Sequence, residues 1–142
     1  MSKILDLLLR PETPDVQKDL PRRDYELLRL SQLYGEPFVV RLKAVPYGRA
    51  VELREMEDYE IQTVLAGDGS GVWKDETLRE SKGAATPAEL VKKLLLPGEI
   101  RAVCVEVEKL SGFRTAVLRP VDPADALAEE LEKNSGTAGM RS

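Results

Sequence analysis

The clearest pattern of apolar and polar positions lies in the stretch TPAELVKKLLLPGEIRAVCVEVEKLSGF (86–113). Apolar residues recur there at intervals of three and four on both sides of Pro97, which is the spacing of a buried helix face. Thr86 and Glu89 have the arrangement of a capping box at the start of the first helix. We predict one helix after Thr86, a second from Pro97 to about Ser111, and a tight αα-hairpin formed by the two.

Three adjacent leucines, Leu94, Leu95 and Leu96, stand where the first of these helices ends. Leu94 falls on its apolar stripe, and Leu95 is spaced from Ile100 as in a hydrophobic staple if Pro97 starts the second helix. Successive helical residues are about 100° apart, so Leu96 points away from the stripe. We expect Leu96 to be buried against strands of the fold. The alternative, an exposed Leu96, would make the turn a contact site.

The second helix has a narrow apolar stripe that includes the one cysteine of the chain, Cys104. The other members of the stripe are Ile100, Val103, Val107 and Leu110. The chain contains no histidine that could activate a thiol. We therefore expect Cys104 to be a small buried hydrophobic residue rather than a nucleophile. One cysteine also excludes an intramolecular disulfide and a four-cysteine zinc site.

Two segments, DYELLRL (24–30) and PFVVRLKAV (37–45), have strand-like patterns. The apolar side of the alternation in the second consists of Phe38, Val40, Leu42 and Ala44. Gly35 lies between the segments in a turn-like stretch, so we predict a β-hairpin. The segment DYEIQTVLAG (58–67) fits both strand alternation and helical spacing, and its β-branched residues favour a third strand.

Shorter helices are predicted elsewhere in the chain. Pro46 is placed to begin a helix that runs to about Met56. Ser2 and Pro11 would cap and end an apolar helix over 3–10. Near the other terminus, DPADALAEELEK (122–133) has the cap and proline of another helix start. Both terminal helices are apolar on one side, so either they complete the core or they bind a partner or a second copy of the chain.

These elements predict an α+β fold. A small antiparallel sheet, made of the β-hairpin and a candidate third strand, would pack with the αα-hairpin and the short terminal helices. We expect three parts: an N-terminal helix with a proline-rich linker (1–22), one core domain (23–119), and an acidic C-terminal helix with a disordered tail (120–142).

Composition narrows the function. The 142 residues include 21 basic and 25 acidic side chains, a net charge of −4, so no basic excess exists to neutralise a run of phosphates. We therefore expect no nucleic-acid partner. No apolar stretch approaches the roughly 20 residues that span a bilayer, and no signal peptide is visible. We expect a soluble, intracellular protein.

The glycine-rich loop GDGSGVWKDET invites a phosphate-binding interpretation, but its spacing fits neither a Walker loop nor a calcium loop. A surface loop is the better interpretation. Trp73 in this loop either packs beneath it or anchors a partner. Carboxylate pairs are numerous enough to arise by chance, and without histidine we predict no catalytic, cofactor or metal site.

The block 86–113 resembles the signature of phage tail assembly chaperones of the XkdN-like type. The resemblance is carried by TPAEL at its start, LPGEI at 96–100 and LSGF at 110–113. The leucine-rich start at 2–9 and the stretch at 27–56 are also similar to that family. The chain departs from the family pattern at DGSGVW, and nothing after about residue 120 matches it.

The resemblance implies a non-enzymatic chaperone in the cytoplasm of a bacterial host. Such a protein would bind the apolar tape-measure protein of a phage or prophage and keep it soluble until tail-tube subunits polymerise. The tail-tube protein and a second copy of the chain are further candidate partners. The alternative is a structural tail or baseplate component that stays in the virion. A longer product made by programmed frameshift is a feature of several such chaperones, and the DNA would show it. The candidate partner-contact residues are Leu5, Leu8, Trp73, Leu96, Leu127 and Leu131.

Overall fold

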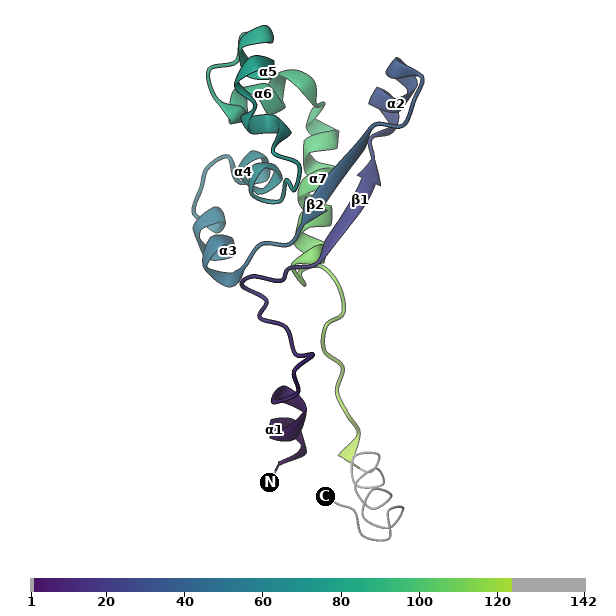
Figure 1. The fold of residues 1–142 in the computed structure, drawn as a ribbon, viewed down its shortest axis with the longest axis vertical. Coiled ribbons are helices and arrows are strands. Elements are labelled where there is room, and N and C mark those ends of the chain that lie inside the picture. The colour runs from purple at the N-terminus through teal and green to yellow at the C-terminus, as the bar shows by residue number, and fades with distance from the viewer. Residues whose placement is uncertain (1, 124–142) are drawn as a thin grey trace. The chain divides into compact units, whose positions relative to one another are not determined.

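The computed structural model describes residues 2–123. They divide into a folded unit, Val16–Thr115, and the two chain ends, and we describe each part by itself. The elements of the folded unit in chain order are β1 (Arg22–Glu26), α2 (Leu28–Tyr34), β2 (Val39–Lys43), α3 (Tyr47–Arg54), α4 (Tyr59–Ala66), η1 (Val72–Lys74), α5 (Glu76–Ser81), α6 (Pro87–Leu94) and α7 (Pro97–Leu110) (Figure 1). Helices combined with a small antiparallel sheet confirm the predicted α+β class.

The predicted pairing of two strands is correct, but their connection is not a simple turn. β1 and β2 are antiparallel, with Arg22 opposite Lys43 and Glu26 opposite Val39. The first strand ends at Glu26, and α2 occupies the connection at one end of the hairpin (Figure 1). The expected strand at 24–30 was therefore wrong in its second half.

The reason lies in the spacing of two buried leucines. Leu27 and Leu30 are both in the core, and a separation of three residues places them on one side of a helical turn. Gly35 ends α2 with φ 72°, a left-handed conformation that favours glycine. Ser31 accepts a hydrogen bond from the backbone N–H of Phe38 at 2.7 Å, which joins the helix to the start of β2.

The predicted third strand was wrong, because residues Tyr59–Ala66 form helix α4. This helix packs against α3, α6 and α7. Adjacent residues Thr63 and Val64 are both fully buried, which shows that its buried face is wide. Burial among three helices outweighs the β-strand preference of its branched side chains.

The two helices around Pro97 begin where the sequence predicts. Thr86 caps α6 by accepting a hydrogen bond from the N–H of Glu89 at 3.1 Å. The Glu89 carboxylate reaches back one residue further than a capping box requires, to the N–H of Ala85 at 2.8 Å. α7 runs from Pro97 to Leu110, in agreement with the predicted end near Ser111.

The core lies where α4, α6, α7 and the sheet meet. Helix α7 packs against α4 on one side and β2 on another, which buries the predicted stripe as far as Val107. The buried cluster consists of Leu27, Leu30, Leu42, Val64, Trp73, Ala84, Leu90, Val91, Leu95, Ile100, Val103 and Val107. Pro46 caps α3, which ends at Arg54, close to the predicted Met56.

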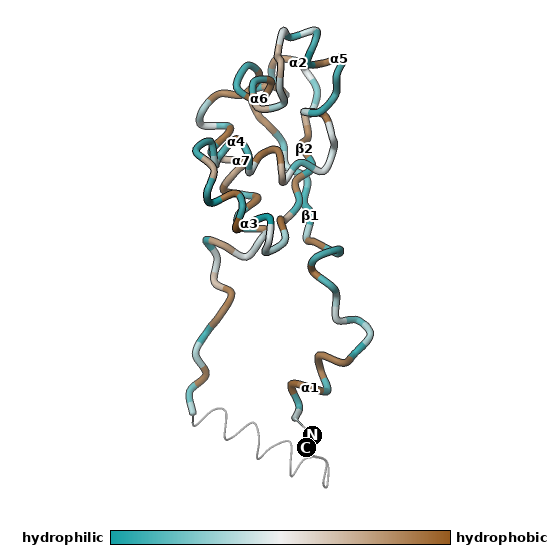
Figure 2. The backbone as a smooth tube through the Cα atoms, turned by 90° about the vertical axis from the view of Figure 1, so that its left-hand side faces the viewer, coloured by the Kyte–Doolittle hydropathy of each residue, from teal (hydrophilic) through white to brown (hydrophobic). Residues whose placement is uncertain are grey.

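The chain ends are described separately. Helix α1 (Lys3–Leu8) forms where predicted, and Ser2 accepts the N–H of Leu5 at 3.4 Å. Its residues are apolar over much of its length and exposed (Figure 2). After α7 the chain forms no regular strand up to residue 121. The predicted helix at 122–133 lies almost entirely outside the described residues. Within residues 2–123, no helix has both the length and the apolar character needed to cross a membrane.

Candidate functional site

The turn between α6 and α7 is held by Arg29 of α2. Its Nε and Nη2 donate to the two carboxylate oxygens of Glu99 at 3.0 and 2.8 Å. Nη2 also donates to the carbonyl oxygen of Leu94 at 2.9 Å. Hydrogen bonding to Arg29 lowers the pKa of Glu99 and, reciprocally, raises the pKa of Arg29. We call these interactions the Arg29 clamp.

Glu99 also completes the start of α7. The N-cap residue, Leu96, has no side-chain oxygen, and its backbone N–H donates instead to Oε1 of Glu99 at 2.8 Å. One carboxylate therefore serves the helix start and the clamp together. The side chain of Glu99 is only 15% exposed, so water competes weakly for these hydrogen bonds.

Leu96 is 53% exposed, so the expectation that it packs against the strands was wrong. Leu95 and Leu96 both have extended backbone conformations. Successive side chains of an extended chain point to opposite sides. Leu95 occupies the core as the staple partner of Ile100, and Leu96 is therefore directed outward. The sequence contained a signal for this outward direction, because Leu96 precedes Pro97 and the residue before a proline favours extended conformations.

The two residues that flank Leu96 line an open groove of about 590 Å³. The groove lies between the start of α4 and the α6–α7 turn. Its apolar lining consists of Ile61, Leu95, Pro97 and Ile100. Its polar lining is mostly acidic and consists of Glu57, Asp58, Tyr59, Glu60 and Lys92. We call this feature, with Leu96 beside it, the turn groove.

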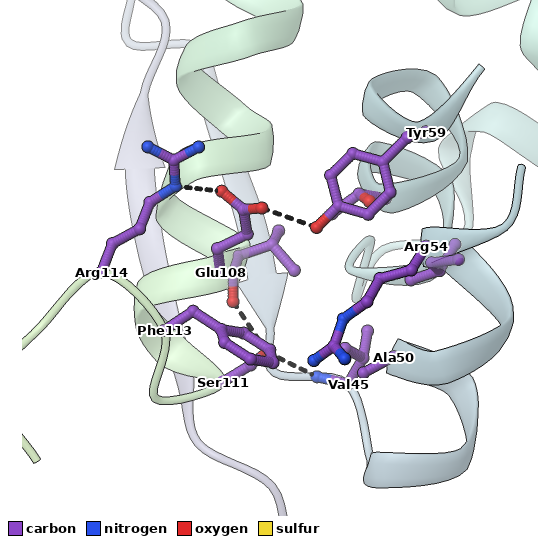
Figure 3. Close-up of a pocket in the computed structure, with 11 residues that line it drawn as sticks. Val45, Ala50, Arg54, Tyr59, Glu108, Ser111, Phe113 and Arg114 are labelled. Carbon is purple, nitrogen blue, oxygen red and sulfur yellow. Dashed lines mark hydrogen bonds and ion pairs between the residues drawn. The ribbon is translucent and has the colours of Figure 1, made fainter. Parts of the chain in front are cut away.

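A second hollow, of about 350 Å³, lies where the end of α7 meets the second half of α3 and the first turns of α4 (Figure 3). Glu108 accepts hydrogen bonds there from the hydroxyl of Tyr59 at 2.6 Å and from Nε of Arg114 at 2.5 Å. Burial, together with Glu108, raises the pKa of Tyr59 to about 12. The guanidinium of Arg54 lies 5.2 Å from the centre of the Phe113 ring.

The polar groups of this hollow chiefly bind one another. Ser111 donates to the carbonyl of Val107 at 2.8 Å and accepts the N–H of Val45 at 3.0 Å, which ties the end of α7 to the segment after β2 (Figure 3). Arg114 has φ 57°, an uncommon conformation for a residue with a side chain. These contacts hold residues 111–114 against α3, α4 and the segment after β2, so we interpret the hollow as a structural junction.

The glycine-rich loop is organised around Asp68. Its carboxylate accepts the N–H groups of Ser70 and Gly71 at 3.0 and 2.8 Å and the hydroxyl of Ser70 at 2.7 Å. These short-range hydrogen bonds give Asp68 a structural role, as the residue that holds the turn of the loop. The glycine spacing of the loop does not match that of a phosphate-binding loop. Within the part of the chain that is described, no group of three histidine, cysteine or acidic side chains could hold a metal ion.

Cys104 is buried on the α7 stripe, as predicted. Burial raises the pKa of its thiol to about 11, and the nearby Glu108 adds to the shift. The thiolate is the reactive form of cysteine, so this thiol is unreactive near neutral pH. The interpretation of Cys104 as a small apolar core residue is confirmed.

The structure separates the six candidate contact residues. Leu5 and Leu8 are 43% and 64% exposed on α1. Leu96 is exposed at the turn groove, whereas Trp73 is 6% exposed and packs in the core, where it offers no surface. Leu127 and Leu131 lie outside the described residues. Sequence reasoning missed the Arg29 clamp, because a contact between residues 70 positions apart leaves no local signal.

Comparison with known proteins adds two findings. The family model described as phage XkdN-like tail assembly chaperone protein matches residues 48–124, more than half of the chain. The crystal structure of the protein yqbn is similar to this fold, with a TM-score of 0.57 and 19% identity. The similarity covers 75% of this chain and 94% of that one, and at this identity it concerns the fold alone. No curated protein matches the chain in sequence.

Proposed function

The chain belongs to the phage XkdN-like tail assembly chaperones, and from this premise we propose that it binds the tape-measure protein and keeps it soluble during tail assembly. The observation that carries the proposal is the family match over residues 48–124, which includes α4, α6, α7 and the turn groove. We further propose that the protein acts without catalysis, in the cytoplasm of the bacterial host.

The surface of the folded unit supports a role in binding apolar partners. A number of its large apolar side chains are exposed, among them Leu28, Leu33, Tyr34, Val39 and Leu96. An apolar partner covered by such residues would lose contact with water, and the free energy gained is proportional to the area covered. A chaperone of this kind needs exposed apolar surface, and these side chains are consistent with that need.

Co-purification tests the proposal. The tape-measure protein encoded with this chain would be co-expressed with it, and an affinity tag on the chain would be used for capture. We expect the two proteins to elute together in size-exclusion chromatography. A tape-measure protein that is well expressed but never elutes with the chain would contradict the proposal. The tagged chain expressed with an unrelated coiled-coil protein is the control.

The alternative role, as a permanent tail or baseplate component, makes a different prediction. A permanent component would be detected by mass spectrometry in purified virions at a fixed ratio to the tail-tube protein. We propose that this chain is absent from virions and abundant in lysates collected before tail completion. Its presence in every purified particle would favour the alternative.

A further inference from the structure

We propose that the turn groove, with Leu96 at its edge, is the surface that binds the tape-measure protein, and that its occupant is an amphipathic helix with lysine or arginine beside its apolar stripe. This inference rests on the proposed function and goes beyond it by assigning the contact to particular residues. It also states the chemistry of the partner segment.

The apolar part of the groove suits the side chains of a helix. Ile61 of α4 lines one side, and Leu95, Pro97 and Ile100 line the other. Leu96 is not part of this lining, but it is exposed and lies in the chain between Leu95 and Pro97, which are part of it. An exposed leucine next to an apolar groove has the form of a binding contact in which both partners bury apolar surface.

The charge of the rim selects a basic partner. Glu57 and Asp58 are exposed at the start of α4, next to Glu60, and Lys92 is the one basic residue of the lining. Arg101 forms an ion pair with Glu60 at 2.9 Å and partly neutralises it. Asp58 does not cap α4 with its side chain, and its carboxylate accepts a hydrogen bond from Nε2 of Gln62 at 3.0 Å while staying exposed. An excess of carboxylates around an apolar surface complements a lysine- or arginine-bearing helix.

The groove is also held in shape before any partner arrives. The Arg29 clamp fixes the carbonyl of Leu94 and the start of α7, on either side of Leu96. Leu95 and Ile100 are anchored in the core. A preformed surface loses little conformational freedom on binding, so more of the contact energy appears as affinity.

The test uses substitutions that remove the contact while preserving the fold. Leu96→Ser removes an exposed apolar side chain at an N-cap, where serine is a favoured residue, so thermal stability should be unchanged or higher. Leu8→Ser makes the same chemical change on α1, where the leucine is similarly exposed. Tyr47→Ser, at the most exposed large apolar residue of α3, is a control on another face.

Affinity for the tape-measure protein would be measured with each full-length variant. We expect Leu96→Ser to raise Kd by about tenfold or more, and Leu8→Ser and Tyr47→Ser to change it by less than about twofold. We also expect the double charge reversal Glu57→Lys with Asp58→Lys to weaken binding and to reduce its dependence on salt. Circular dichroism would confirm that each variant is folded.

Three results would overturn the inference. Unchanged affinity for both folded Leu96→Ser and the folded charge reversal at Glu57 and Asp58 would exclude the turn groove, and a loss confined to Leu8→Ser would assign binding to α1 instead. Loss of self-association by Leu96→Ser, with tape-measure binding intact, would show that the groove binds a second copy of the chain. A wild-type chain that fails to bind the tape-measure protein would instead refute the proposed function itself.

Discussion

Gly67 lies at the end of α4 against the side chain of Val107, and we expect a larger residue there to destabilise the fold. A Cβ there would lie 2.7 Å from Cγ1 of Val107 and closer still to Cγ2. Val107 is fully buried in α7, so it has little space into which to move. The backbone of Gly67 is held as well, because its carbonyl accepts the N–H of Lys43 at 2.8 Å.

The free energy of unfolding can be worked out for two substitutions and their combination. Gly67 has φ −88°, which alanine adopts freely, so Gly67→Ala alone would stabilise by about 0.4–1 kcal/mol through the unfolded chain. Overlap with Val107 costs about 1–3 kcal/mol, so the net effect ranges from near zero to a loss of about 2.5 kcal/mol. Val107→Ala removes two buried methyl groups and costs about 2 kcal/mol or more.

The double variant decides whether the overlap is the cause. In the Val107→Ala background the new methyl group at position 67 enters vacated space, so Gly67→Ala should become neutral or stabilising. Urea unfolding followed by circular dichroism would measure all four proteins. We expect a coupling free energy equal to the overlap cost, about 1–3 kcal/mol, between the two sites. Effects of the two substitutions that add within about 0.5 kcal/mol would show that Val107 does not obstruct a side chain at position 67.

Three further predictions concern titration and the clamp. The folded state raises the pKa of Tyr59 from an ordinary value of 10.0 to about 12. The stability that comes from the protonated hydroxyl is therefore complete below pH 10 and should be lost as pH rises toward about 12. Tyr59→Phe should remove this pH-dependent loss of stability from an alkaline unfolding curve. The pKa of the Cys104 thiol is raised from an ordinary 9.0 to about 11, so a second loss of stability is expected between pH 9 and 11. The native protein should not react with a thiol reagent at neutral pH until denaturant is added. Glu99 has a lowered pKa, so its contribution to stability is present above the ordinary value of 4.5 and is lost as pH falls through the folded value. Glu99→Gln should therefore reduce the loss of stability at acid pH. An acid unfolding curve that Glu99→Gln leaves unchanged would contradict the Arg29 clamp.

Much of the fold can be predicted from local sequence where caps and prolines mark the boundaries. Thr86 and Pro97 set the starts of α6 and α7, and the alternation around Leu42 sets the buried side of β2. In contrast, α4 could not be identified, because its branched residues favour a strand and only burial among three helices decides the matter. The sequence pattern likewise did not reveal that α2 replaces a turn, although Leu27 and Leu30 carry its helical spacing.

The turn groove, too, could be predicted only in part from local sequence. The three leucines correctly marked the turn, and the staple between Leu95 and Ile100 occupies the predicted positions. The outward direction of Leu96 follows from the backbone conformation imposed before Pro97, which a helical wheel ignores. The acidic rim and the Arg29 clamp arise from residues far apart in the chain, and only the tertiary structure brings them together.

We propose that this chain keeps the tape-measure protein soluble by binding it. The most direct measurement is the fraction of tape-measure protein that stays in the supernatant after high-speed centrifugation, with and without co-expression of the chain. We expect most of the tape-measure protein to be soluble with the wild-type chain and most of it to sediment without the chain. An equal soluble fraction in both cases would contradict the claim.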